Sequence, residues 1–337
     1  MKRVYFLLFL CLFSIEAIAQ SEDSLSKHPD FQMLRANENY EYLKDKTSKT
    51  FWEKLKYVGK GNHYLSVGGT TRSDFQVLLN EGWEDGNDDK GLLFQRFMAH
   101  ADWHINQHIR LFGELKSGFA IDRNGEKSPL DTDELDVHQL FIDFRLGKSK
   151  LQIGRQELWY GSRRLISIRE GTNIRQSFDG VRWIWQNKNH RLDALFFAYN
   201  PQKTGFFDNN INTDRLLWGL YHVWNQSASF NLDLYYLGID NATSFFQEGE
   251  LSETRHSLGL RHWGKKGNWK FNNEAIFQFG EFGSQNIRAW TISSEVYYKL
   301  RSDGLEPTLG LKAEVISGDK TPDDGKLQTF NPLYPRG

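Results

Sequence analysis

From Tyr64 onward, apolar and polar side chains alternate with a period of two, in segments of about ten to fourteen residues separated by clusters of Gly, Asn, Asp and Lys. In the segment 93–104 the odd positions are apolar apart from Gln95, and the even positions carry the charges. The apolar set is Leu93, Phe97, Ala99, Ala101 and Trp103, and the polar set is Arg96, His100, Asp102 and His104. Because successive side chains of a strand point to opposite faces, each segment predicts a β-strand with one apolar and one polar face.

About fourteen such segments follow one another. They lie near 63–78, 92–105, 108–121, 134–147, 150–158, 163–168, 178–187, 190–200, 213–225, 228–239, 253–264, 268–281, 286–300 and 306–317. The links 147–149, 187–189 and 265–267 are short, whereas other links are longer and acidic or rich in Asn, namely 80–91, 122–133, 200–213 and 240–252. Alternating short turns and long loops are typical of an outer-membrane barrel.

Segment length separates two all-β folds that share this alternation. A soluble β-sandwich, such as a secreted sugar-binding module, uses strands of about five or six residues, whereas about ten residues match a tilted membrane crossing. Aromatic residues make up 15% of the chain and charged residues 25%, with a mean hydropathy of -0.61. Aromatic girdles around an apolar band, with polar side chains in the lumen, explain this mixture. The sequence therefore predicts an all-β, transmembrane antiparallel up-and-down β-barrel of porin type, with the sandwich as the alternative.

The N-terminus has the layout of a secretory signal. Met1-Lys2-Arg3 precedes an apolar run too short to span a bilayer, and Ala17-Ile18-Ala19 provides a cleavage site, so residues 1–19 predict export to the outer membrane of a Gram-negative cell. Cys11 is the one cysteine and lies within this signal, so the mature protein has no thiol chemistry. Residues 20–60 predict a periplasmic segment that is partly helical or disordered.

The last residues, Asn331 to Gly337, look like a loop. A closed barrel needs a last strand that pairs with the first. We therefore expect residues 61–337 to be a barrel domain that lacks its final strands, with closure by another chain as the alternative.

Arginines and acidic residues are concentrated between residues 151 and 180. The arginines are Arg155, Arg163, Arg164, Arg169 and Arg175, and the acids among them are Glu157, Glu170 and Asp179. Guanidinium groups are always charged and match carboxylates, so a ring of them in a pore favours polyanions or anionic sugars. The alternative is that they pair with lumen carboxylates and fix strand register, and the two roles can hold together.

This region and four other runs resemble the alginate-export outer-membrane channel family. The runs are GLLFQRFMAHADWHI, LDVHQLFIDFRLG, TDRLLWGLYHVWN and FNPLYPRG, and the resemblance extends from about Gly61 to the last residue. It implies a monomeric barrel of about eighteen strands, whose pore is lined by arginines and acids that attract and pass a uronate polymer.

The motif positions and the polar strand faces give the expected lumen contacts. The arginines are Arg96, Arg110, Arg145, Arg155, Arg164, Arg169 and Arg175, with Asp143, Glu157 and Asp179 as acidic partners. The resemblance further implies that the partners are outer-membrane lipid, an anionic poly- or oligosaccharide and periplasmic export components. The formal net charge of -1 gives no global attraction to nucleic acid.

Enzyme and metal motifs are absent from the sequence. It has no G-x-S-x-G elbow, Gly-rich phosphate loop or H-E-x-x-H pair, so we predict no catalytic residues and no cofactor. His100, His104 and His108 recur every fourth residue but straddle a turn of the predicted hairpin, so they predict no metal site. The pairs Asp131/Asp133 and Asp323/Asp324 lie in predicted loops, where they are solvated or bind Ca²⁺ loosely.

The function expected from the sequence is facilitated diffusion or export of an alginate-like uronate through an arginine-lined lumen, gated by long loops or the N-terminal segment. The alternatives are a general or small-solute porin and a secreted soluble carbohydrate-binding sandwich.

Overall fold

The computed structural model describes residues 31–78, 90–121, 127–301, 306–321 and 324–336. The predicted signal peptide, much of the loop 80–91 and Asp323 lie outside these residues. The chain divides into two compact units, Met1–Asn39 and Tyr40–Gly337. In the described part of the first unit, Arg35 of the 3-10 helix η1 (Arg35–Asn37) pairs with Glu38 at 2.6 Å.

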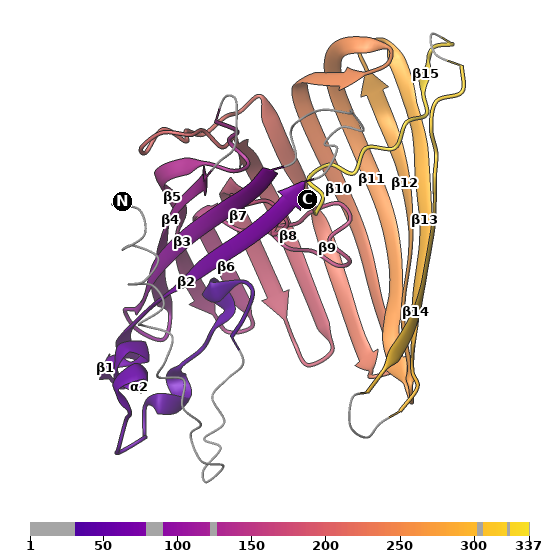
Figure 1. Ribbon diagram of the computed structural model, residues 1–337. Helices are drawn as coiled ribbons and strands as arrows, with labels where there is room; N and C mark the ends of the chain where they lie inside the picture. Colours follow the sequence, from indigo (N-terminus) through magenta and orange to yellow (C-terminus); the bar gives the residue numbers. More distant parts are fainter. Residues whose placement is uncertain (1–30, 79–89, 122–126, 302–305, 322–323, 337) are drawn as a thin grey trace. The chain divides into compact units, whose positions relative to one another are not determined.

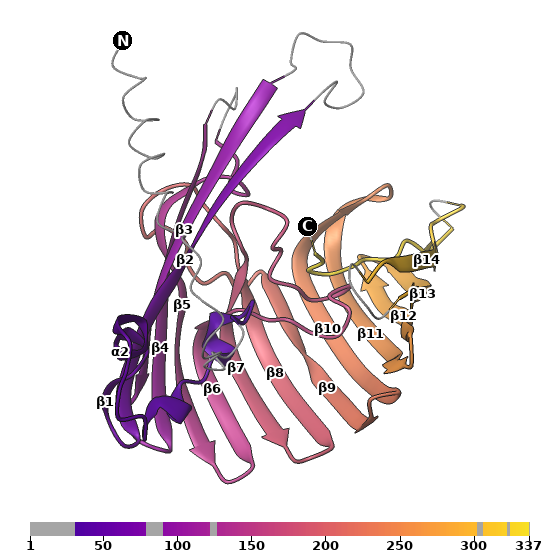
Figure 2. The same cartoon turned by 60° about the horizontal axis from the view of Figure 1, so that its bottom comes forward.

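The second unit is an antiparallel sheet whose strands follow chain order from β1 to β14 (Figure 1). The strands are β1 (Val58–Lys60), β2 (His63–Leu78), β3 (Lys90–His104), β4 (Ile109–Ile121), β5 (Asp133–Leu146), β6 (Ser149–Gln156), β7 (Ser177–Gln186), β8 (His190–Asn200), β9 (Arg215–Ser227), β10 (Phe230–Phe246), β11 (Gly249–Lys266), β12 (Trp269–Phe282), β13 (Gln285–Lys299) and β14 (Thr308–Ile316). Two short helices, η2 (Glu41–Leu43) and α2 (Phe51–Lys56), precede the sheet, and β15 (Lys326–Leu327) pairs in parallel with β13. Figure 2 shows the sheet curving from β2 round to β14.

The two faces of the sheet are inverted relative to those of a soluble protein. On the inner face charged side chains are buried, with Arg96 at 2% and Asp143 at 0% exposure. On the outer face Leu140 and Ile292 are 52% and 57% exposed. An exposed apolar face around a buried polar one suits a wall that meets lipid, and argues against a sandwich with an apolar interior.

Every predicted strand except 163–168 has its counterpart in the sheet, so the up-and-down fold is confirmed. In the described residues, no helix is long and apolar enough to cross a membrane.

The strand predicted at 163–168 is wrong. These residues belong to the connection between β6 and β7, where Arg163 has a left-handed backbone with a φ of 68°. Leu165, Ile166 and Ile168 are all buried, and Leu165 and Ile166 join an apolar cluster with Phe178. Apolar residues that pack inside the sheet produced the same local pattern as a wall strand.

The long loop predicted at 240–252 is also wrong. β10 runs to Phe246 and β11 begins at Gly249, so only two residues connect them. The polar side chains that suggested a loop pair across the hairpin instead. Thr254 Oγ1 donates to Asp240 Oδ2 at 2.7 Å, and Ser244 Oγ donates to Glu253 Oε2 at 2.6 Å.

Most connections at one end of the strands are short, and we call this end the short-turn rim. Its turns are 105–108, 147–148, 187–189, 228–229 and 267–268, followed by the longer connection 300–307. The opposite end carries the long connections 157–176 and 201–214. In outer-membrane barrels the short turns face the periplasm.

Candidate functional site

The connection from Glu157 to Gln176, here called the inner loop, crosses the inner face of the sheet. Near one end, Arg72 on β2 donates to the carbonyl of Glu170 at 2.8 Å, and Asn173 Nδ2 donates to the carbonyl of Gln95 on β3 at 3.0 Å. Near the other end, Arg164 reaches β12, β13 and β14. The loop thus joins the first and last long strands of the sheet from inside.

Arg164 makes the contacts at that second end. Its Nε donates to Glu274 Oε2 at 3.2 Å, its Nη1 to Glu314 Oε1 at 2.7 Å and its Nη2 to Ser293 Oγ at 2.7 Å. Three acceptors on three adjacent strands fix this guanidinium in place.

A second inner segment, the described residues of 317–336, runs beside the inner loop. The backbone N–H of Tyr334 donates to the carbonyl of Leu165 at 2.8 Å, and that of Ser167 donates to the carbonyl of Tyr334 at 2.9 Å. Tyr334 also packs against Phe178 with ring centroids 5.0 Å apart. The arginine-rich region 151–180 and the run FNPLYPRG, which lie far apart in the sequence, therefore meet on the inner face.

Residues of the inner loop, the second inner segment and strands β11 to β14 line a cavity of about 1320 Å³, which we call the basic cavity. It reaches toward the short-turn rim, since Ala228, Asn268 and Lys299 line it. Its basic lining residues are Arg163, Arg164, Arg261, Lys265, Lys270, Lys299, Lys312 and Arg336, whereas its acidic lining residues are Glu295 and Glu314. Trp263, Phe271, Tyr297 and Phe330 add aromatic surface.

Half of the basic residues in the cavity are matched by carboxylates. Arg164 pairs with Glu314, Arg261 with Asp233 at 2.8 Å, Lys299 with Glu306 and Lys312 with Glu295 at 3.5 Å. The other four form no ion pair with another described residue, and these are Arg163, Lys265, Lys270 and Arg336.

Arg163 shows how closely the positive charges are grouped. Its guanidinium lies 4.7 Å from the ring centroid of Trp159. Burial and the neighbouring charge of Arg336 lower the pKa of the Arg163 guanidinium, and Arg261 adds to this effect. Crowded like charges favour binding of an anion.

Most of the arginines expected to contact cargo are paired with wall or loop carboxylates. Arg155 forms a bidentate pair with Asp179 at 2.9 and 3.1 Å. Arg110 pairs with Asp102 and, at 3.3 Å, with Asp143. These pairs have the geometry of the register-fixing role that the sequence left open.

Two further expected contacts hold the inner loop itself. Arg175 bonds to Glu157 Oε1 at 3.1 Å and to Glu170, and Arg96 bonds to Glu170 Oε1 at 2.6 Å. Burial raises the pKa of the Glu170 carboxyl, but the hydrogen bond and charge of Arg175 and the charge of Arg96 outweigh it, so the pKa lies below its ordinary value.

Of the remaining expected contacts, Arg164 lines the basic cavity, whereas Arg145 and Arg169 form no side-chain ion pair with another described residue. Contact of any of these side chains with cargo stays a prediction.

Sequence reasoning missed the cavity residues contributed by strand ends. In the sequence pattern Lys265 belongs to a short turn, and Arg336 belongs to the loop-like ending and to the run FNPLYPRG. The only sequence signal that the two residues share is a cation next to a short link or at the end of a motif. This signal is weak until the folded sheet places both residues in one cavity.

The sequence model of a family described as alginate export matches residues 63–337. A comparison with curated proteins found no match. The fold is similar to three Pseudomonas aeruginosa crystal structures. OccK2 (OpdF) in complex with glucuronate is 15% identical with a TM-score of 0.50, and the match covers 76% of this chain and 64% of that one.

OccK8 (OprE) is 12% identical with a TM-score of 0.48, and the match covers 75% of this chain and 67% of that one. OccK11 (OpdR) is 13% identical with a TM-score of 0.45, and the match covers 75% of this chain and 62% of that one. The chain therefore spans about two thirds of the length of these structures, and at such low identity the likeness to OccK2 shows the fold alone.

Proposed function

The chain belongs to the alginate export family, and from this premise we propose that it forms an outer-membrane channel for an anionic poly- or oligosaccharide. The basic cavity is the observation that supports this cargo most strongly. Four cations that form no ion pair with another described residue, beside aromatic rings, suit a chain of sugar rings that each carry a carboxylate.

Transport needs attraction that is spread over several sites and weak at each one. The acids Glu295 and Glu314 within the cavity keep a bound polyanion from being held too tightly. The cavity reaches toward the short-turn rim, which faces the periplasm in outer-membrane barrels, so we propose that polymer enters from there and is exported. In this proposal residues 1–19 are the export signal and residues 20–60 a periplasmic segment.

A small-solute porin is the second candidate, because the inner loop occupies the inner face and narrows the path. Under this alternative, uronate monomers such as glucuronate, the ligand named for the OccK2 structure, would bind as tightly as oligomers.

The test measures binding of oligoglucuronate to the purified protein in detergent by calorimetry. In water a unit charge about 6 Å away contributes about 0.7 kcal/mol, so changing Lys265 and Lys270 together to Gln weakens binding about tenfold. The matched control changes Lys148 and Lys188, which lie in other turns of the same rim, and leaves the affinity unchanged. Equal weakening in both pairs, or equal affinity for a neutral oligosaccharide, would contradict the proposed cargo.

A further inference from the structure

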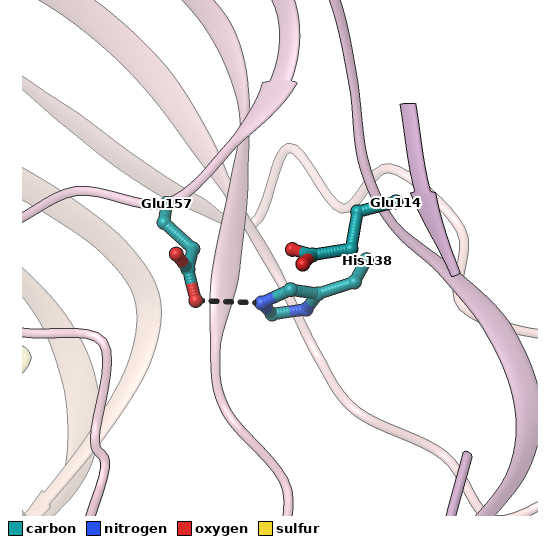
Figure 3. A group of neighbouring side chains, drawn as sticks. All are labelled: Glu114, His138 and Glu157. Atoms are coloured by element: carbon teal, nitrogen blue, oxygen red, sulfur yellow. Dashed lines mark hydrogen bonds and ion pairs between the residues drawn. The ribbon is translucent and has the colours of Figure 1, made fainter. Parts of the chain in front are cut away.

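Three side chains able to bind a metal converge where the inner loop begins (Figure 3). Glu114 lies on β4, His138 lies on β5 and Glu157 is the first residue of the inner loop. One ligand atom from each lies within 4.8 Å of the other two, and all three residues are buried. His138 Nε2 lies 2.9 Å from Glu157 Oε1, as the dashed line in Figure 3 marks.

A fourth candidate ligand comes from the neighbouring strand. His100 on β3 is directly opposite Glu114 in the register, and its Nδ1 lies 3.8 Å from Glu114 Oε1. Its side chain is 3% exposed. Two carboxylates and two imidazoles make up a ligand set that suits tetrahedral Zn²⁺.

The buried charges around the cluster do not balance. Among the described residues, the carboxylates of Glu114, Glu157 and Glu170 interact with two guanidinium groups, those of Arg96 and Arg175, so the carboxylates outnumber the guanidinium groups by one. A buried charge of this kind is normally compensated by a partner or a metal.

Two neighbouring groups do not remove this excess. Lys116, the next cation along β4, is matched by Asp133 at 3.2 Å. Nε2 of the buried His138 faces Glu157, and its Nδ1 has no hydrogen-bond partner among the described residues. The excess of carboxylates therefore points to a cation bound within the cluster.

We propose that Glu114, His138 and Glu157, with His100 as a fourth ligand, bind a divalent transition-metal ion of the zinc class. The ion ties the first residue of the inner loop to strands β3, β4 and β5. Arg175 keeps its second carboxylate, Glu170, when Glu157 turns to the metal. The site is independent of the cargo proposed above.

The first experiment strips the purified protein with a chelator in detergent and titrates it with Zn²⁺ by calorimetry at pH 7. We expect about one Zn²⁺ per chain and much weaker binding of Mg²⁺ and Ca²⁺, which prefer more oxygen ligands. X-ray absorption of the zinc-loaded protein shows nitrogen and oxygen ligands at about 2.0–2.1 Å with imidazole scattering. Absence of stoichiometric zinc binding would overturn the proposal and leave a proton on a histidine as the counter-charge.

Variants assign the ligands. His138→Gln and Glu114→Gln each weaken zinc binding by more than about 100-fold, because losing a ligand exceeds the effect of losing an outer partner. The control, His256→Gln, changes a histidine that bonds to Tyr236 at 2.8 Å outside the cluster, and leaves zinc affinity unchanged. Heat-modifiable migration reports whether each variant folds. Wild-type zinc affinity in a folded His138→Gln or Glu114→Gln variant would overturn the assignment of these ligands. If neither variant folds, an X-ray absorption spectrum of the zinc-loaded wild-type protein without imidazole scattering would overturn it.

Discussion

In protein stripped of metal with a chelator, replacing Arg175 with Met is predicted to release the inner loop from the wall. Its side chain is 5% exposed and bonds to Glu157, which is 2% exposed, and to Glu170. Met fills similar volume but leaves the Glu157 carboxylate without its guanidinium. Breaking a buried pair in this way costs about 3–5 kcal/mol.

The cost is limited because Glu157 can take up a proton instead. From an ordinary carboxyl pKa of about 4.3, protonation at pH 7 costs about 3.7 kcal/mol, and at pH 5 about 1 kcal/mol. The defect is therefore about 3–4 kcal/mol at pH 7 and shrinks as the pH falls. A change of this size shifts the ratio of attached to released loop by a factor of several hundred.

Planar-bilayer recording measures this release as larger and noisier single-channel conductance. We expect Arg175→Met to differ most from wild type at pH 7 and least at pH 5. Arg145→Met is the matched control, since the Arg145 side chain forms no ion pair with another described residue. Wild-type conductance and noise in Arg175→Met at pH 7, or a defect that grows toward pH 5, would refute the reasoning.

Three other outcomes are expected. In the wild-type protein the pKa of Glu170 is lowered, so its pairing stabilises the loop fully above the ordinary carboxyl pKa and is lost as the pH falls through the lowered pKa. Conductance noise therefore stays constant from pH 8 to 5 and rises only in stronger acid. A rise already at pH 6 argues against this role of Glu170. Ile292→Arg on the outer face lowers the free energy of unfolding in lipid by about 2–4 kcal/mol in urea titrations, whereas Ile292→Leu does not. Equal stability of the two variants would mean that this face does not contact lipid. Arg336→Gln, which changes a lining residue of the basic cavity, weakens oligoglucuronate binding about threefold in calorimetry. An unchanged affinity would remove Arg336 from the cargo site.

The wall of the sheet could be predicted from the sequence because, in each lipid-facing strand, apolar and polar residues alternate according to the face on which they lie. Leu140 and Asp143 occupy opposite parities and lie on opposite faces, as expected. This local rule fails where a segment packs inside the sheet. Leu165 and Ile166 are apolar because they contact other inner residues, and nothing in their neighbours along the chain distinguishes this from contact with lipid.

The candidate site was harder to predict because its residues are brought together by pairing over long separations. The sequence identified the arginine-rich region 151–180, but whether a guanidinium there is matched depends on distant carboxylates such as Glu274 and Glu314, which pair with Arg164. In the sequence, Lys265 and Lys270 are ordinary residues that flank a turn. Only in the folded sheet do they line one cavity with Arg336.

Selection of anionic sugars by a path along the inner face is the activity proposed for this protein. It is tested most directly by planar-bilayer recording of the full-length protein under a KCl gradient, with oligoglucuronate added to either side. We expect a reversal potential that favours anions, block at lower oligoglucuronate concentration from the side of the short-turn rim, and no block by a neutral oligosaccharide. A cation-selective channel, or equal block by charged and neutral oligosaccharides, would contradict it.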